Sequence, residues 1–188
     1  MSGRLETVLA AIDAANAEDP TGATGEAPAL LYGQRMTAEL ARLHPDASEP
    51  LAIAARGQHV ERWTIPRDSY PAGREGYLAW RRALGAYHAE RVAGLMAEAG
   101  YGAEDQARAA RMLRKEGIKR DPEVQALEDV ICFVFLRWYA GDFLAGREDG
   151  VRIVARTARK MSAPARERAL SEFELPGPLA DAIRGAGG

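Results

Sequence analysis

The chain has 188 residues, 47% of them hydrophobic and 28% charged, and a formal net charge of −2. These are the values of a globular protein, and a nearly neutral chain is not drawn as a whole to nucleic acid or to an anionic membrane. The one cysteine, Cys132, excludes an internal disulfide and is expected to be a small buried residue. Neither a leader pattern nor an apolar stretch of membrane-spanning length is evident, so we expect a cytoplasmic protein.

Helical periodicity dominates the chain, and the alternating pattern of strands is hard to find. Helix signals include the N-cap residues Ser48 and Asp121 and the stop at Gly100. The predicted helices cover about residues 4–17, 28–44, 49–62, 74–98, 103–116, 122–145, 148–160, 163–172 and 177–184. Loops are predicted over 18–27 and 64–73, and a frayed tail over 186–188. The sequence therefore predicts one compact all-α domain over 1–188, with the nearly all-apolar helix 122–145 at its centre.

Residues 59–88 hold two of the three histidines, two of the three tryptophans and five arginines. Arginine forks bind carboxylate and phosphate, and aromatic faces stack on planar groups. On the predicted helix 74–98 one stripe carries Arg74, Tyr77, Arg81 and His88, which would suit an anion with a planar group. Alternatively the aromatic residues belong to the core and the arginines pair with nearby acids, and the sequence leaves both interpretations open.

A second constellation is spread along the chain. His59 ends one predicted helix, His88 lies in the middle of the next, and Glu128 and Asp129 lie in the predicted central helix. If these helices pack together, imidazoles and carboxylates converge as ligands for iron, manganese, cobalt or zinc. Either histidine could instead be a general base oriented by a carboxylate. The structural alternative is a hydrogen-bonded, partly buried histidine and an ordinary ion pair.

A basic stripe covers residues 108–120, which carry six positive charges and one negative charge. Such a stripe could serve a nucleic-acid or protein adaptor. A run of this kind is more often a solvated helix face, and the acidic balance of the whole chain favours that interpretation. Nucleic acid is therefore an alternative partner rather than the expected one.

Several strings spread over most of the chain are specific in combination: 13–16, 31–36, 58–63, 76–81, 88–90 and 121–130. Together they resemble a family catalogued as domain of unknown function 4202. The resemblance implies a shared fold and no secure activity.

More distantly, the order of helices is similar to the HD superfamily of metal-dependent phosphohydrolases. In that superfamily an early histidine, a His–Asp pair and a late aspartate bind the metal. In this resemblance Gln34 stands at the early histidine, Gln58 and His59 at the His–Asp pair, and Asp129 at the late aspartate, while His88 is similar to an additional histidine of larger sites. Gln34 and Gln58 are poor ligands, so the resemblance does not imply a conventional HD metal centre.

Three hypotheses follow. The first is an HD-like hydrolase acting on a small phosphorylated or nucleotide-like anion, with His59, His88, Glu128 and Asp129 as catalytic groups and His59, His88 and Asp129 as metal ligands. The residues expected to bind its substrate are Tyr32, Gln34, Gln58, Arg62, Trp63, Arg74, Tyr77, Arg81 and Lys115. The second hypothesis is a non-catalytic module that binds a small anion or nucleotide. The third is the adaptor that uses residues 108–120.

Overall fold

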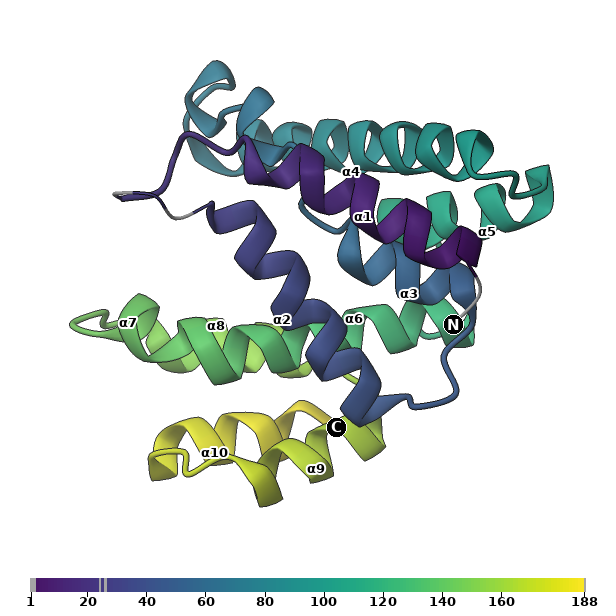
Figure 1. Cartoon of the computed structure of the whole chain (residues 1–188). Helices are drawn as coiled ribbons and strands as arrows, with labels where there is room; N and C mark the ends of the chain where they lie inside the picture. Colours follow the sequence, from purple (N-terminus) through teal and green to yellow (C-terminus); the bar gives the residue numbers. More distant parts are fainter. Residues whose placement is uncertain (1–2, 24, 26, 188) are drawn as a thin grey trace. The chain divides into compact units, whose positions relative to one another are not determined.

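The computed structural model describes residues 3–23, 25 and 27–187, and over these residues it is all-α, as predicted (Figure 1). The chain forms two compact units, Met1–Glu116 and Gly117–Gly188. The prediction of one domain over 1–188 stays a prediction. Thr24 and Glu26 of the predicted loop 18–27, and Gly188 of the predicted tail, lie outside the described residues. Among the described helices none has the length and apolar character needed to cross a membrane.

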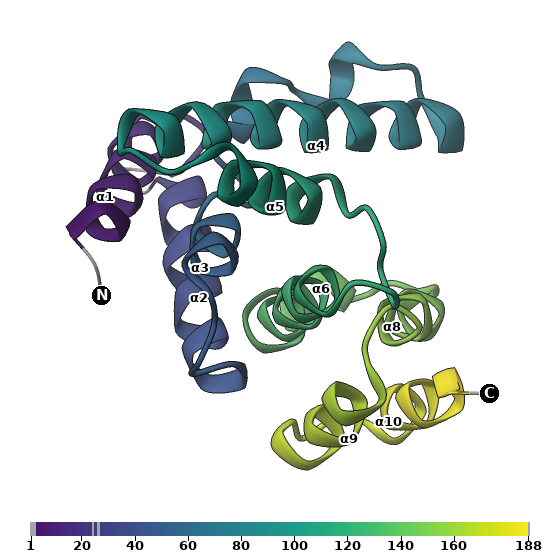
Figure 2. The same cartoon turned by 90° about the vertical axis from the view of Figure 1, so that its right-hand side faces the viewer.

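The first unit is built around a helical hairpin. Its elements are α1 (Gly3–Ala17), α2 (Pro28–Leu43), α3 (Glu49–Arg56), η1 (Arg62–Thr64), η2 (Arg67–Ser69), α4 (Gly73–Glu98) and α5 (Ala103–Arg114). Helix α5 returns along α4, and Figure 2 shows α2 and α3 beneath this pair. Gly85 lies at the approach of the two helices, where a Cβ would be 3.3 Å from the Leu113 carbonyl oxygen. The lack of a side chain at Gly85 therefore lets the end of α5 lie against α4.

The end of α3 differs from the prediction. Helix α3 starts where predicted, with the Ser48 side chain accepting a hydrogen bond from the backbone N–H of Leu51 at 3.2 Å. It ends at Arg56 instead of 62, so the predicted helix over 57–62 is wrong. A Cβ on Gly57 would be 2.5 Å from Cγ2 of Val92 in α4. The close approach leaves no room for a side chain at residue 57, which is the C-cap of α3, and the chain turns after it; His59 lies in that turn.

The second unit contains α6 (Pro122–Val134), the π-helical η3 (Phe135–Tyr139), α7 (Ala140–Leu144), α8 (Gly150–Ala158), α9 (Ala163–Glu172), α10 (Gly177–Arg184) and η4 (Gly185–Gly187). Asp121 caps α6 by accepting from the backbone N–H groups of Glu123 and Val124 at 2.9 and 3.2 Å. The predicted helix 122–145 is thus broken by a π segment, whereas α9 and α10 have their predicted bounds.

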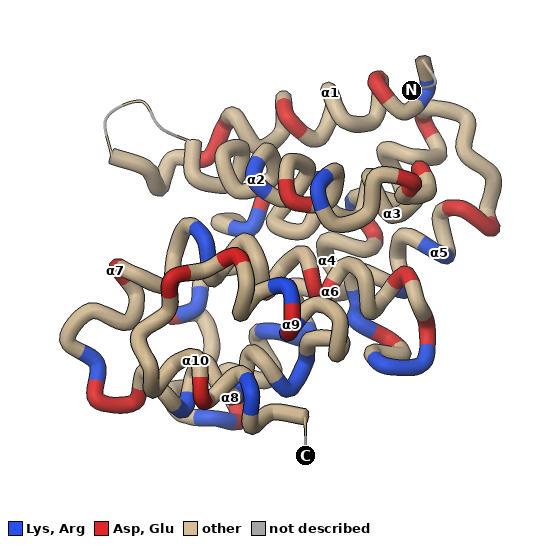
Figure 3. Tube along the Cα trace, turned by 90° about the horizontal axis from the view of Figure 1, so that it is seen from below, with Lys and Arg blue, Asp and Glu red and all other residues tan. Residues whose placement is uncertain are grey.

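Acidic and basic residues are interspersed along the helices of the second unit (Figure 3). Glu172 forms ion pairs with Arg137 at 2.8 Å and with Arg168 at 2.6 Å, and Asp181 forms an ion pair with Arg184 at 2.6 Å. Such exposed pairs contribute little stability each, but they neutralise the arginines locally. These arginines are therefore poor candidates for binding an anion.

Candidate functional site

Glu61 ties the turn after α3 to the rest of the first unit. Its backbone N–H donates to Oδ1 of Asn16 at 2.9 Å, and its carboxylate accepts from the Tyr87 hydroxyl at 2.6 Å and from Nε of Arg91 at 3.0 Å. Burial raises the pKa of Glu61, but the hydrogen bonds from Arg91 and Tyr87 lower it by more. The net pKa lies below its ordinary value, so the group stays ionised. The left-handed φ of 48° at Glu61 costs about 1 kcal/mol, which these bonds offset.

The segment that follows rests on the start of α4. The indole Nε1 of Trp80 donates to the Ile65 carbonyl at 2.9 Å, and the guanidinium of Arg62 lies over the Trp80 ring at 4.7 Å. A Cβ on Gly76 would collide with the Pro71 carbonyl oxygen. These contacts fix Arg62 and the turn that carries His59 beside α4.

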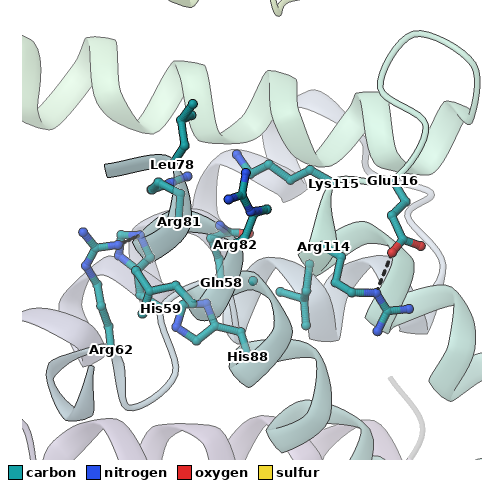
Figure 4. A pocket seen from close by; sticks show the side chains of 13 residues that line it. Gln58, His59, Arg62, Leu78, Arg81, Arg82, His88, Arg114, Lys115 and Glu116 are labelled. Atoms are coloured by element: carbon teal, nitrogen blue, oxygen red, sulfur yellow. Dashed lines mark hydrogen bonds and ion pairs between the residues drawn. The ribbon is translucent and has the colours of Figure 1, made fainter. Parts of the chain in front are cut away.

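One face of α4 and the end of α5 enclose a pocket of about 430 Å³ (Figure 4). Its lining from α4 recurs every three or four residues, which is the spacing of one helical face. The lining consists of Gln58, His59, Arg62, Leu78, Arg81, Arg82, Leu84, Gly85, His88, Leu113, Arg114, Lys115 and Glu116. All of these residues belong to the first unit.

Lys115 ends α5 in a left-handed conformation, with φ 60°. Its N–H donates to the Met112 carbonyl at 3.0 Å, and the N–H of Glu116 donates to the Arg111 carbonyl at 3.1 Å. Glycine is the usual residue in such a cap, and a lysine there costs about 1 kcal/mol. With lysine instead of glycine at this cap, an ammonium group lines the pocket, where glycine would contribute no side chain.

The pocket carries an excess of positive charge. Its lining has four cationic side chains besides Arg114, namely Arg62, Arg81, Arg82 and Lys115, and one carboxylate, Glu116. That carboxylate already binds Nε of Arg114 at 2.8 Å, and Figure 4 shows this pair at one side of the pocket. Among the described residues no carboxylate forms an ion pair with Arg81 or Arg82.

Two uncharged histidines line the same pocket. The ring of His59 stacks on Tyr32 at 3.7 Å between centroids and lies 6.3 Å from the ring of His88. Burial, and then the charge of Arg62, hold the pKa of His59 well below its ordinary value of 6.5. Burial, Arg62 and Arg81 lower the pKa of His88 to about 3. Both imidazoles are therefore neutral at pH 7.

Two buried polar atoms of the lining are left without partners. Within the described part of the chain, neither Oε1 of Gln58 nor Nε2 of His88 has a hydrogen-bond partner. Both residues are buried, with 4% and 3% of their surface exposed. Leaving a buried polar group unsatisfied costs about 1–3 kcal/mol, so a partner from outside the protein chain would stabilise these two atoms.

The predicted substrate-binding residues fall into two groups. Gln58, Arg62, Arg81 and Lys115 line the pocket together with His59 and His88, and Tyr32 stacks on His59. The remainder lie outside the lining: Gln34, Trp63, Arg74 and Tyr77. Gln34 and Arg74 are exposed, and Tyr77 is 46% exposed. The predicted stripe of Arg74, Tyr77, Arg81 and His88 therefore faces the pocket only through its last two members.

Glu128 and Asp129 belong to the second unit, where both are buried and engaged. Oδ1 of Asp129 accepts from the Ser162 backbone at 2.8 Å and from Nε2 of Gln125 at 2.9 Å. Oε1 of Glu128 lies 3.4 Å from Nζ of Lys160. These contacts hold both carboxylates within their own unit, and the catalytic role predicted for Glu128 and Asp129 stays a prediction.

The pocket itself does not fit a divalent metal. His59 and His88 are two nitrogen donors, but four cationic side chains surround them, and a divalent cation would be repelled. Over the described ranges, no three His, Cys, Asp or Glu side chains gather as a metal site would need. The metal predicted at His59, His88 and Asp129 stays a prediction.

Some lining residues were missed from the sequence. Arg82 lies four residues after Leu78, and Gly85 and His88 continue the same face. The three-and-four spacing of residues 78–88 would have found Arg82 if the face of α4 had been known. Arg114 and Glu116 were counted in the basic stripe 108–120, in which Arg108 also pairs with Asp105 at 3.5 Å.

Comparison with known proteins gives a family and no relative of assigned activity. No curated protein and no solved structure matches the chain significantly. One family model, described as a domain of unknown function (DUF4202), matches residues 6–183. This range includes every residue of the pocket. Because the match covers nearly the whole sequence, the chain belongs to the DUF4202 family.

Proposed function

We propose that the first unit binds a small phosphate-bearing anion in the pocket between α4 and α5. The observation that carries this proposal is the convergence of Arg62, Arg81, Arg82 and Lys115 on a lining whose one carboxylate is already paired. Guanidinium groups match phosphate oxygens in geometry and charge. A volume of about 430 Å³ is within the range of small-ligand sites.

The electrostatics of the lining support the same proposal. Burial, and then repulsion from Arg81, lower the pKa of Arg62, so the two guanidinium groups oppose each other's charge. Like charges at short distance destabilise a fold unless a counter-charge is supplied. A phosphate group between them would relieve this repulsion and convert it into attraction.

The test compares two arginines of the same helix. Arg81→Ala removes a lining charge, whereas Arg74→Ala removes an exposed charge outside the lining. We expect Arg81→Ala to weaken pyrophosphate binding about 10- to 100-fold, since a hydrogen bond between charged groups contributes about 1.5–3 kcal/mol. Isothermal titration calorimetry at an ionic strength of about 0.15 M measures the difference, because salt at this concentration screens exposed charges most strongly.

Arg74→Ala should change the affinity by less than about twofold, since its charge is exposed and screened. Equal losses in the two variants would mean that pyrophosphate senses only the general charge of the unit. Thermal unfolding of both variants checks that the fold is intact. Equal losses in two folded variants, or no binding of pyrophosphate to the wild type, would overturn the proposal.

Phosphoester hydrolysis is the second candidate, and the neutral imidazole of His59 favours it. A neutral imidazole can accept a proton from a water that attacks phosphorus, and the cationic groups can stabilise the charge of the leaving oxygen. A bound anion offsets the charges of Arg62 and Arg81 and so raises the pKa of His59 toward its ordinary value. Phosphate release that disappears in His59→Gln, with ligand binding retained, distinguishes an enzyme from a binding module.

A further inference from the structure

The buried pair Gln58 and His88 gives the pocket a polar part that phosphate alone does not use. Arg62, Arg81, Arg82 and Lys115 offer donors and positive charge. The unpartnered atoms are of a different kind, because Oε1 of Gln58 is an acceptor and Nε2 of the neutral His88 is an acceptor or a donor according to its tautomer. An ionised phosphate oxygen can only accept, so it cannot satisfy the Gln58 carbonyl.

A hydroxyl group is the ligand group that fits this pair best. It donates one hydrogen bond and accepts others, so it can donate to Oε1 of Gln58. It can also pair with Nε2 of His88 in either tautomer, and with the Gln58 amide in either orientation. An aliphatic group would leave both atoms unsatisfied, at the full cost of their desolvation.

The rest of the lining argues against a nucleobase. Recognition of a base commonly uses an aromatic side chain on which the base stacks. In the described lining the two imidazoles are the only ring side chains, and Tyr32 already stacks on His59. Trp63, Tyr77 and Trp80 do not line the pocket. The aromatic residues of this stretch therefore do not serve as a platform inside it.

We infer that the ligand of this pocket is a hydroxylated phosphate ester, of the class of sugar phosphates and polyol phosphates, whose hydroxyl groups bind Gln58 and His88. The inference rests on the proposed binding of phosphate by the arginines and adds the chemistry of the part that phosphate does not fill. In this inference the arginines and Lys115 bind the phosphate. Gln58 and His88 bind the hydroxyl groups and so select a hydroxylated ester.

The test uses two esters that differ only in hydroxyl groups. Glycerol 3-phosphate and propyl phosphate have the same carbon chain and the same phosphate. We expect the wild-type protein to bind glycerol 3-phosphate about 5- to 100-fold more tightly, because propyl phosphate leaves buried polar atoms unpaired. Isothermal titration calorimetry with both esters gives this ratio, and adenosine 5′-monophosphate serves as the nucleobase comparison.

The variant Gln58→Met separates selection from affinity. Methionine has a similar length to glutamine and no polar amide, so it removes the unpartnered carbonyl without opening a cavity. We expect the ratio of the two affinities to fall toward one, while the protein without ligand unfolds at the same Tm as the wild type or a higher one. Arg81→Ala should weaken both esters alike and leave their ratio unchanged, because it acts on the phosphate.

The outcomes distinguish the two proposals. If both esters bind equally and both depend on Arg81, phosphate binding stands and the hydroxyl inference is overturned, with water satisfying the buried pair. Tighter binding of adenosine 5′-monophosphate than of ribose 5-phosphate, which carries the sugar and the phosphate without the base, would also overturn it in favour of a nucleobase. If neither ester depends on Arg81, the proposed function itself fails.

Discussion

Lowering the pH from 7 to 5 should reduce the unfolding free energy of the first unit by about 2 kcal/mol for His88 alone. The unfolded chain takes up a proton on this imidazole as the pH falls through about 6.5, whereas the folded protein keeps it neutral down to about pH 3. Between these values the unfolded state binds more protons, so acid favours unfolding. His59 shifts in the same direction and adds to the loss.

Urea unfolding at pH 7 and pH 5 measures this loss, in buffers free of phosphate so that no anion stabilises the pocket. A Trp138→Phe background removes the tryptophan of the second unit and leaves Trp63 and Trp80, both in the first unit, as the fluorescent reporters. In this background His88→Leu should lose about half of the acid sensitivity. An unfolding free energy that stays constant or rises toward pH 5, or an unchanged loss in His88→Leu, would contradict the account.

Gly76→Ala should destabilise the first unit by about 2–4 kcal/mol. The added Cβ would collide with the Pro71 carbonyl oxygen, and backbone atoms cannot move aside as the end of a flexible side chain can. The segment before α4 would have to shift, and it carries Arg62 and the turn with His59. We therefore expect pyrophosphate binding to weaken in the same variant.

Gly94→Ala is the matched control, because both glycines lie in α4 and, outside the backbone of the helix itself, no atom of the described residues lies within 4 Å of a Cβ at Gly94. Alanine there should stabilise the protein by about 0.5–1 kcal/mol through its higher helix propensity. The two substitutions are thus expected to have opposite signs when measured by urea unfolding. A similar stability of Gly76→Ala and Gly94→Ala would show that the segment before α4 yields easily.

Helix ends that depend on local chemistry could be predicted from the sequence. Ser162 caps α9 through the Ala165 N–H, and prolines lie in the first turns of α9 and α10, so the signals lie within a few residues of each boundary. The end of α3 at Arg56 and the π segment over 135–139 could not be predicted. The end of α3 coincides with the approach of Gly57 to Val92, which are 35 residues apart in the numbering, and a local sequence pattern does not report such packing.

In the candidate site, too, features set by local spacing could be predicted, and features set by packing between helices could not. Arg81 and His88 are two helical turns apart, so a shared face followed from their spacing, and both line the pocket. The side of the pocket formed by the end of α5 depends on the α4–α5 hairpin, which Gly85 allows and which brings Lys115 to the pocket. That face of α4 was not known from the sequence, so Arg82 was missed and Arg74 and Tyr77 were included.

Backbone strain also marks the site. Of the three described non-glycine residues with positive φ, Glu61 and Lys115 lie on the two segments that meet around the pocket, and Lys119 belongs to the second unit. Such strain often occurs at functional sites, where the surrounding structure holds it. Here Glu61 holds the turn of His59 to Tyr87 and Arg91, and Lys115 supplies a charge. Both strained residues thus support the placing of the pocket's side chains.

The most direct test of the account is an NMR titration of the histidine rings with pyrophosphate. His59 and His88 line the pocket, and the third histidine, His44, does not, so it is an internal control. We predict that the ring signals of His59 and His88 move together and saturate, that His44 stays in place, and that Arg81→Ala needs about 10- to 100-fold more anion. Signals of His59 and His88 that stay unmoved, or that move no more than that of His44, would contradict an anion site in this pocket.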